Sequence, residues 1–487
     1  MPQLRDSGNS GSSISLPLSA QFSGFARIFG IETEYGVAVT GNERPVDAGQ
    51  VAMMMFQPIV SRSRSTNTYL TNGSRLYLDV GSHPEYATAE ARDPLDALKQ
   101  DMAGELVMRR LAMQAQQQLR DHGYGEHACV HVFKNNADSA GHSFGCHENY
   151  LVRRFVSLEQ VEHELLPFLI TRQLYTGAGR VTDTGFEITQ RADFLDEAVS
   201  SATTRSRPMV NTRDEPHADP EEFRRLHVII GDSNRSQWAT WMKLAVTHLV
   251  LCVIEESARV GKPSGFDEFT LAEPGDANRA LSRDVTCQQA RLQLADGRQM
   301  TALDIQRGYL RIVEQFVQAH ANAMNEAIPN DTADHVLAQW RHVLDVLASG
   351  RVHELADRVD WVAKQRLFDA LRARQGSAVS RARLEQLDMD YHDIANGSVY
   401  GALQRRGAIL QLFDDTAAQH ALAEPPADTR AVLRGRFVAA ALAAGARFSC
   451  DWTRLTLSSP EHGEAVILDP FQVEPTPDVK RIMDALV

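Results

Sequence analysis

The sequence predicts an α+β protein with a sheet-rich first half, a mainly helical middle and a small α+β unit at its C-terminal end. Short runs between Arg27 and Ile230 alternate apolar and polar residues with a period of two, as strands do. From Ser236 onward the apolar residues recur at helical spacing, and a proline-rich linker begins at Glu424. We therefore expect a disordered tail over residues 1–24, a large domain over 25–423 and a small domain over 424–487.

The first predicted strand follows the N-terminal tail, which is rich in Ser and Gly and has no long apolar run. From Arg27 the alternation places Glu32 and Glu34 on one face of that strand. A short helical stretch around residues 51–60 comes next, and Asn72-Gly73 then predicts a tight turn into a strand over 75–80. The strands therefore present carboxylates from two separate parts of the chain.

The helix after these strands has a clear beginning and end. Asp93 is a good N-cap, Pro94 suits the first helical position, and the pattern ends near Gly123. Further strands are expected over 128–134, 149–153, 186–190 and 226–230, and helices dominate from Ser236. Beyond the linker we expect an Ala-rich helix that ends near Gly445 and one alternating strand over 447–457.

Composition excludes several classes of protein. The net charge of -13 and the pI near 5.7 argue against a nucleic-acid or membrane-surface binder, because those polyanionic partners select basic surfaces. No apolar run approaches the roughly 18 residues that span a bilayer. The five cysteines are scattered and form no CxxC pair, which predicts a reducing, cytoplasmic location.

The strongest chemical signal is a set of carboxylates on predicted strand faces. Arg75, Tyr77 and Asp79 share one face, with His83 and two more carboxylates just downstream. Together with the first strand, one surface could collect five carboxylates, namely Glu32, Glu34, Asp79, Glu85 and Glu90. Such a cluster needs a hard cation such as Mg²⁺, which carboxylates and substrate phosphates hold in ATP sites. The alternative is a solvated polar sheet face.

Two other motifs resemble those of nucleophilic enzymes, but their surroundings in the sequence argue against a catalytic nucleophile. Residues 141–145 match the Gly-x-Ser-x-Gly pattern, but a loop precedes them and a strand follows, where the motif needs a strand and then a helix. Cys146 and His147 are neighbours on a predicted strand, so they point to opposite faces and cannot act as a thiolate and its base. We expect Cys146 to be buried and inert.

A family resemblance rests on long motifs spread along the chain. These are Gly30-Ile-Glu-Thr-Glu-Tyr-Gly36, the stretch 72–90, Phe133-Lys-Asn-Asn136, Gly145-Cys-His-Glu-Asn-Tyr150, the stretches 200–208, 211–217 and 226–234, and Asp451-Trp452. In these motifs the chain resembles the Pup ligase family over almost everything after Arg27. The resemblance implies a glutamine synthetase-like fold, in which helices back a curved antiparallel sheet and a small C-terminal domain packs against the catalytic domain.

The resemblance also implies roles for particular residues. It makes Glu32, Tyr77 and Glu85 the magnesium ligands and Asp79 the catalytic base. It makes Arg75, Thr88 and Trp452 contacts of ATP. These residue types suit the roles, since oxygen ligands suit a hard cation, Arg suits phosphate and Trp stacks on adenine.

Other roles stay open at this point. A Trp on an amphipathic strand is more often a core residue, which is the competing interpretation of Trp452. Arg205 and Arg207 could bind phosphate or form surface ion pairs. His227 is expected to be a hydrogen-bonded core or supporting histidine rather than a proton carrier. The roles of Glu34 and Glu90 are undecided.

The implied activity is ATP-dependent joining of Pup, through the side chain of its C-terminal glutamate, to lysines of target proteins, which marks them for proteasomal degradation. The main alternative is the sister enzyme that deamidates Pup and removes it from proteins. That enzyme has a long extra loop after the first strand, whereas here a modest segment over 37–71 joins the two motifs. A small-molecule γ-glutamyl-amine ligase and an inactive Pup adaptor are further alternatives. The adaptor is disfavoured because every expected metal and base position holds a competent residue.

Overall fold

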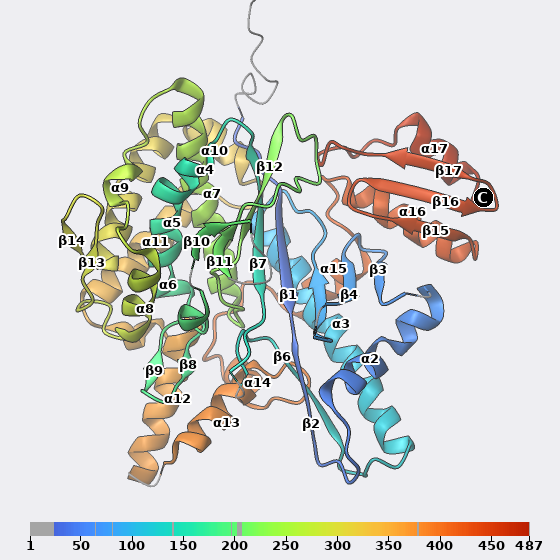
Figure 1. The fold of residues 1–487 in the computed structure, drawn as a ribbon, viewed down its shortest axis with the longest axis horizontal. Coiled ribbons are helices and arrows are strands. Elements are labelled where there is room, and N and C mark those ends of the chain that lie inside the picture. The colour runs from blue at the N-terminus through green and yellow to red at the C-terminus, as the bar shows by residue number, and fades with distance from the viewer. Residues whose placement is uncertain are drawn as a thin grey trace, which may run out of the picture.

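The computed structural model describes residues 24–63, 65–79, 81–138, 141–195, 197–201, 207–376 and 379–486. The expected tail thus lies outside the described residues except for Gly24, and Arg205 lies outside them too. An eight-stranded sheet forms the centre of the molecule (Figure 1). Its strands, in spatial order, are β10 (Glu197–Ser200), β11 (Pro208–Asn211), β12 (Phe223–Val228), β7 (Cys146–Arg153), β1 (Phe29–Glu34), β5 (Pro84–Ala87), β4 (Arg75–Leu78) and β3 (Asn67–Tyr69).

The sheet is antiparallel except at one edge. Every neighbouring pair is antiparallel save β10 and β11, which are parallel. One face of β1 buries Phe29, Ile31 and Thr33, while Gly30, Glu32 and Glu34 stay partly accessible on the other face. The predicted placement of both glutamates on one face is therefore confirmed.

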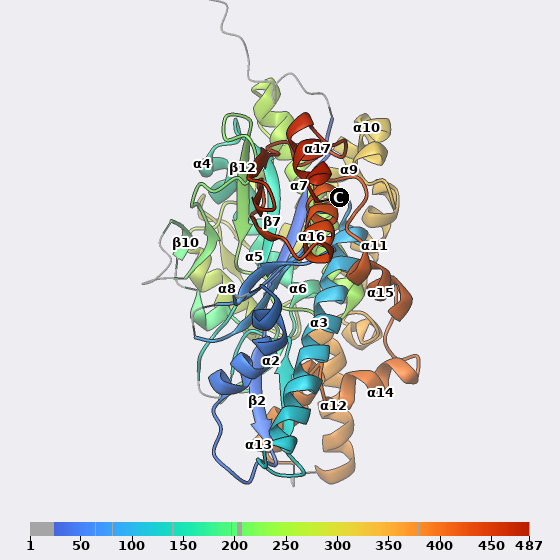
Figure 2. The ribbon, with the colours of Figure 1, turned by 90° about the vertical axis from the view of Figure 1, so that its right-hand side faces the viewer.

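Helices cover the buried face of the sheet. Against it pack α3 (Pro94–Asp121), which Asp93 caps as predicted, and α7 (Gln237–Val260). Figure 2 shows α3, α11 and α15 together on one side of the sheet. The remaining helices of this region are α4 (Leu158–Gln160), α5 (Leu166–Thr171), α6 (Gln173–Thr176), α8 (Pro274–Arg283), α9 (Ala302–Ala319), α10 (Ala321–Ala327), α11 (Ala333–Ala348), α12 (Asp360–Gln375), α13 (Arg381–His392), α14 (Val399–Arg405) and α15 (Asp415–Ala423).

Helix α7 corrects one expectation from the sequence. It is long and apolar enough to cross a bilayer by length and composition, although no such run was expected. The most apolar 18 residues of α7 are fully buried inside the fold, where they belong to the main core. In this structure α7 is thus the core helix behind the central strands.

Three smaller units complete the fold. Strands β2 (Gly36–Thr40) and β6 (Cys129–Phe133) form a separate pair next to α2 (Ala48–Ser63), and β8 (Arg180–Val181) pairs with β9 (Phe186–Glu187). Strands β13 (Leu292–Gln293) and β14 (Gln299–Met300) pair near α8. The strand expected over 186–190 is therefore shorter than predicted, because the chain leaves β9 to build a loop.

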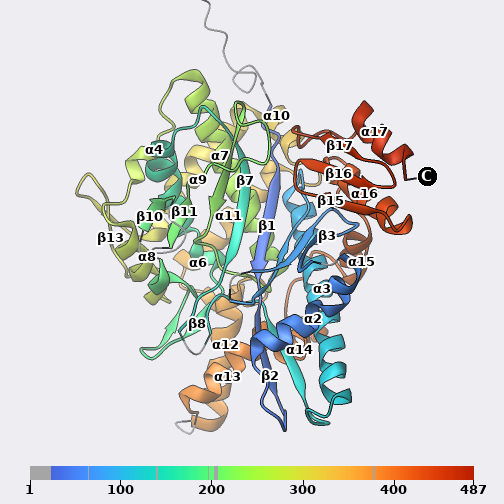
Figure 3. The same ribbon diagram turned by 45° about the vertical axis from the view of Figure 1, so that its right-hand side comes forward.

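The C-terminal unit follows the predicted linker. It contains α16 (Ala431–Ala443), a three-stranded sheet of β15 (Arg447–Cys450), β16 (Arg454–Ser459) and β17 (Gly463–Val466), and α17 (Pro477–Asp484). Figure 3 shows this unit beside the β3 and β4 edge of the large sheet. The single strand predicted over 447–457 is wrong, since a turn at Asp451 splits it into β15 and β16. The Asp451 carboxylate accepts the backbone N–H groups of Thr453 and Arg454, which stabilises that turn.

Candidate active site

Three carboxylates meet at the end of the central strands. Strand pairing places Glu85 opposite Glu34 on one side and opposite Tyr77 on the other. Carboxylate oxygens of Glu34, Asp79 and Glu85 lie within 4.8 Å of one another. Burial, followed by the charges of Glu32 and Glu34, raises the pKa of Glu85 well above its usual range. The Tyr77 hydroxyl interacts with the Glu85 carboxylate, so this cluster offers a crowded set of oxygen ligands.

Asp79 lies in a tight turn just after β4. Its backbone N–H donates to the carbonyl of His83, and its own carbonyl accepts the N–H of Ser82. Ser82 has a φ of 64°, in the left-handed region, so the turn is held in a conformation that is uncommon for a residue with a side chain. The His83 ring stacks on Phe144 with centroids 5.0 Å apart. These contacts fix where the Asp79 carboxylate enters the cluster.

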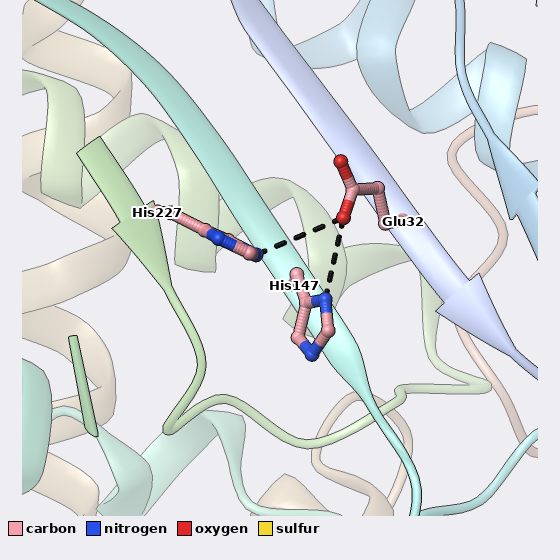
Figure 4. A group of neighbouring side chains, drawn as sticks. All are labelled: Glu32, His147 and His227. Atoms are coloured by element: carbon pink, nitrogen blue, oxygen red, sulfur yellow. Dashed lines mark hydrogen bonds and ion pairs between the residues drawn. The ribbon is translucent and has the colours of Figure 1, made fainter. Parts of the chain in front are cut away.

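A second potential cation site lies next to the first. Glu32, His147 and His227 bring one ligand atom each to within 4.8 Å of the others (Figure 4). His147 Nδ1 is 3.3 Å and His227 Nε2 is 3.7 Å from Glu32 Oε2. Burial, together with the neighbouring His147, lowers the pKa of His227 to about 3, which keeps it neutral at physiological pH. A neutral imidazole is the form that binds a metal ion.

Two observations on these residues fit a bound cation. His227 Nε2 is buried and has no hydrogen-bond partner among the described residues, which is unusual for a buried polar atom. Gly145 leaves space between the two groups, because a Cβ there would lie 2.3 Å from His147 Nε2 and 2.8 Å from Glu34 Oε1. A ligand set of carboxylates, a phenol and two imidazoles suits a divalent cation.

A pocket opens beside these groups along the first part of β1. Thr88 and Glu32 line it on the sheet side, and Arg430, His217 and Trp452 line it on the other side. The Thr88 hydroxyl oxygen accepts the N–H of Ile31 at 3.0 Å, so its position is set by the sheet. Basic and aromatic side chains therefore line the same pocket as the Glu32 carboxylate.

Trp452 is placed differently from the core interpretation. It lies in the turn between β15 and β16, half-buried, at the wall of the pocket. Its ring meets Tyr69 edge to face with centroids 5.2 Å apart, and the Arg434 guanidinium lies 4.9 Å from the ring centroid. The broken strand turns this side chain away from the small apolar core, which explains why strand periodicity misled the interpretation.

The expected arginines lie at different places. Arg75 is on the same strand as Tyr77, its guanidinium lies 4.1 Å from that ring centroid, and its Nε donates to Asn67. Arg207 is exposed and donates to the carbonyl of Ser143. Arg225 also lines the pocket and lies 3.3 Å from Glu32 Oε1. Its alternation with His227 along β12 is the signal that could have identified it.

Two sequence interpretations of this face need correction. Glu90 does not join the carboxylate cluster, because β5 ends at Ala87 and the Glu90 side chain instead pairs with Arg430 and Arg434. His227 is not a hydrogen-bonded core histidine, since its ring faces Glu32 and its Nε2 lacks a hydrogen-bond partner among the described residues, but its place beside Glu32 fits the other alternative, a supporting histidine. The expected burial of Cys146 is confirmed, and burial raises the pKa of its thiol.

The fold and this site define a class of protein. The sheet is covered by helices on one face and carries neighbouring carboxylate and histidine groups on the other, next to a pocket lined by arginine and tryptophan. This arrangement is typical of enzymes that act on phosphorylated substrates with divalent cations.

The family model for Pup-ligase protein matches residues 27–456. The chain is 65% identical, over the full length of both chains, to the Pup–protein ligase of Bifidobacterium longum subsp. infantis. It is 56% identical to that of Bifidobacterium animalis subsp. lactis, covering 100% of this chain and 98% of the relative. The chain therefore belongs to the Pup ligase family.

Solved structures of this family match the fold. The crystal structure of the complex between the prokaryotic ubiquitin-like protein Pup and its ligase PafA superposes with a TM-score of 0.86 at 37% identity, covering 95% of this chain and 91% of that one. The structure of PafA in complex with ADP matches with a TM-score of 0.78 at 38% identity, covering 91% and 94% of the two chains. The predicted α+β class is confirmed.

Proposed function

We propose that this protein uses ATP to join Pup to lysine side chains of target proteins, marking them for degradation. The single observation that carries the proposal is the pocket lined by Thr88 and Trp452, which opens directly onto the carboxylate of Glu32. A nucleotide bound there places its phosphates next to the two potential cation sites. The family relationship supports the chemistry, since relatives are named Pup–protein ligases and one was solved with ADP.

In this proposal Trp452 stacks on the adenine, and Thr88 and Arg75 contact the nucleotide. Glu32, Tyr77 and Glu85 would hold Mg²⁺. His147 and His227, which lie beside Glu32, would supply further ligands. When bound, Mg²⁺ neutralises the charge that builds up on the transferred phosphoryl group. The raised pKa of Glu85 supports this assignment, because crowded buried carboxylates are stabilised in their ionised form by a cation.

The reaction has two steps. A carboxylate oxygen of Pup's C-terminal glutamate attacks the γ-phosphorus of ATP, and the bond to the bridging oxygen breaks with its electron pair leaving on ADP. Asp79 then accepts a proton from the lysine ammonium of the target, so that the neutral amine can attack the acyl carbon. The carbon–oxygen bond breaks, inorganic phosphate leaves with the electron pair and takes up the proton that the nitrogen loses, and the isopeptide bond forms.

Three further assignments belong to the same proposal. The region over 424–487 acts as a small separate domain, which its own apolar cluster around Phe437, Leu457 and Ile482 supports. The region over 25–423 is the catalytic domain, since it carries the carboxylates and both histidines. The protein works in the cytoplasm, which its five free cysteines favour.

The proposal is tested with the full chain, ATP, Mg²⁺, Pup ending in Glu and a lysine-bearing acceptor protein. We expect a conjugate whose mass equals Pup plus acceptor minus one water, with one ADP formed per conjugate. The matched reaction replaces Pup with free glutamate and a small amine. Conjugation of glutamate with no response to Pup would assign the protein to small-molecule γ-glutamyl-amine ligases, and no conjugate of either kind would refute the ligase assignment.

A further inference from the structure

Arg191 is a buried arginine whose charge has no carboxylate partner in the part of the chain that the structure describes. It follows β9 on a loop, and only 3% of the residue is exposed. Its Nη1 donates to the carbonyl of Ile229 at 2.6 Å, and its Nε has no hydrogen-bond partner within the described ranges. Among the described residues, no carboxylate oxygen lies within 4.0 Å of this guanidinium.

Other buried arginines of the protein differ in this respect. Arg27 pairs with Glu255 and Arg172 pairs with Glu148. Arg430 and Arg434 share Glu90. An unpaired buried charge is unfavourable, because burial removes water that the protein has not replaced. The lone guanidinium of Arg191 therefore points to an anion that arrives from outside the chain.

Arg191 lies near the carboxylate cluster of the candidate active site. Burial lowers the pKa of Arg191, and the nearby charges of Glu34 and Asp232 act against that effect. Asp232 is already engaged, since its carboxylate accepts the N–H groups of Ala178 and Gln190. Glu34 belongs to the carboxylate cluster that closes β1. Arg191 thus lies near the end of the cluster and not in the nucleotide pocket.

Strand register relates this end to the pocket. Val228 and Ile31 are both paired with Glu148 of β7, so β12 and β1 flank β7 and run in the same direction, with these two residues at the same level. The carbonyl that Arg191 contacts, that of Ile229, follows directly after β12. The nucleotide pocket is lined by the earlier residues of β1, from Phe29 to Glu32. A triphosphate that extends along β1 from this pocket therefore directs its terminal phosphate toward Glu34 and Arg191.

We propose that Arg191 binds the phosphoryl group while it passes from ATP to the Pup carboxylate and then leaves as inorganic phosphate. This inference rests on the proposed function. In both steps the phosphoryl oxygens carry negative charge, and a planar guanidinium in a water-poor site offsets that charge through charge-assisted hydrogen bonds. Arg191 is thus a phosphate-binding residue that acts from the opposite end of the site to Trp452.

The experiment measures binding of inorganic phosphate to the enzyme loaded with ADP and Mg²⁺. We expect phosphate to raise the melting temperature of the wild type in this state, because a ligand that binds only the folded protein stabilises it. In Arg191→Met we expect the phosphate-dependent rise to disappear, ADP affinity to stay within about threefold of the wild type, and conjugation to fall by roughly 10²-fold or more. Arg191→Lys keeps the charge but loses the planar fork, so it retains a weakened phosphate response.

Arg172→Met is the matched control, because it removes a buried arginine that does have a carboxylate partner. It strands Glu148 and lowers the melting temperature of the ligand-free protein more than Arg191→Met does. A purely structural role for Arg191 predicts the reverse order of the two melting temperatures.

The inference is overturned if Arg191→Met keeps the wild-type phosphate response. It is equally overturned if Arg191→Met does not fold while Arg191→Lys folds and binds phosphate like the wild type. Because phosphate binding needs no Pup, failure of conjugation in the wild type would sink the proposed function without deciding this one.

Discussion

At the scale of single residues, Asp79 gives the most direct test of the proposed chemistry. Asp79→Asn preserves the shape of the side chain but cannot accept a proton. We therefore expect conjugation to fall by roughly 10²-fold or more, in line with the loss of a general base. ADP affinity, measured on the same preparation by calorimetry, should stay within a factor of about two. Conjugation near the wild-type rate would remove Asp79 from its role as base.

The metal assignment makes a graded prediction for the ligand residues. Glu32→Gln and Glu85→Gln each remove a negative ligand, so the Mg²⁺ concentration for half-maximal ADP binding should rise by about tenfold or more. Tyr77→Phe removes only a neutral phenol and should raise it less. His227→Asn tests the second group, and its effect should resemble that of Glu32→Gln because both residues serve one site. Unchanged Mg²⁺ dependence in all four variants would show that the assignment is wrong.

Single residues were predictable where strand alternation alone decides their face. Glu32, Glu34, Tyr77 and Asp79 lie on the predicted face because each is on, or directly follows, a strand that buries its alternate residues. For His227 the sequence left a core role and a supporting role open, and strand alternation could not decide between them. Local pattern gives the face of a residue on its own strand, but the neighbour that gives His227 a role, Glu32, reaches it only through the order of strands in the sheet.

At the scale of elements, Glu90, which follows β5, forms ion pairs with Arg430 and Arg434 at the start of α16, and we expect these pairs to make the stability of the C-terminal unit depend on pH. The charges of Arg434 and Arg430 lower the pKa of Glu90 to about 2 from its ordinary 4.5, against the opposing effect of burial. A lowered folded-state pKa stabilises the protein above pH 4.5, and that stability is lost as the pH falls toward 2. The corresponding free energy is on the order of 3 kcal/mol.

Glu90→Gln tests this element contact. It leaves two buried arginines without their shared carboxylate, so we expect the free energy of unfolding at pH 7 to fall by about 3–5 kcal/mol. Urea unfolding, followed by the intrinsic fluorescence of the five tryptophans, measures it. Glu424→Gln, an exposed linker acid, is the control and should change stability by less than about 0.5 kcal/mol. Equal stability of the two variants would contradict a structural role for the Glu90 pairs.

Element boundaries were predictable where caps and prolines mark them. Asp93 caps α3 through the N–H of Leu95 with Pro94 in the first turn, as the sequence indicated. The turn at Asp451 was missed because the residues on both sides of Asp451 and Trp452 alternate in the way that a single strand would. Only the hydrogen bonds of the Asp451 carboxylate reveal that the run folds back there.

At the scale of the whole molecule, the site depends on contacts between distant parts of the chain. The sheet order places β1 between β5 and β7, and the pocket adds Arg430 and Trp452 from the C-terminal region. Arg430 ties this wall together, since it pairs with Glu90 and donates to the carbonyl groups of His217 and Ile467. Local sequence patterns carry no information on such long-range pairing, so the α+β class was predictable and the exact membership of the site was not.

The last prediction separates a ligase from a hydrolase of similar architecture. A ligase must protect its acyl phosphate from water while a bulky protein lysine enters. The segment between β1 and β3 is short here, with β2 and α2 as its described elements, and this favours an open route for the lysine. We therefore expect Pup ending in Gln to be deamidated slowly or not at all, while Pup ending in Glu is conjugated with one ATP consumed per bond. Mass spectrometry of both Pup forms over one time course measures the two rates.

Slow removal of Pup in the presence of ADP and phosphate agrees with a ligase, because a catalyst accelerates both directions of its reaction. Fast deamidation of the Gln form with negligible conjugation of the Glu form would place the protein among the deamidases.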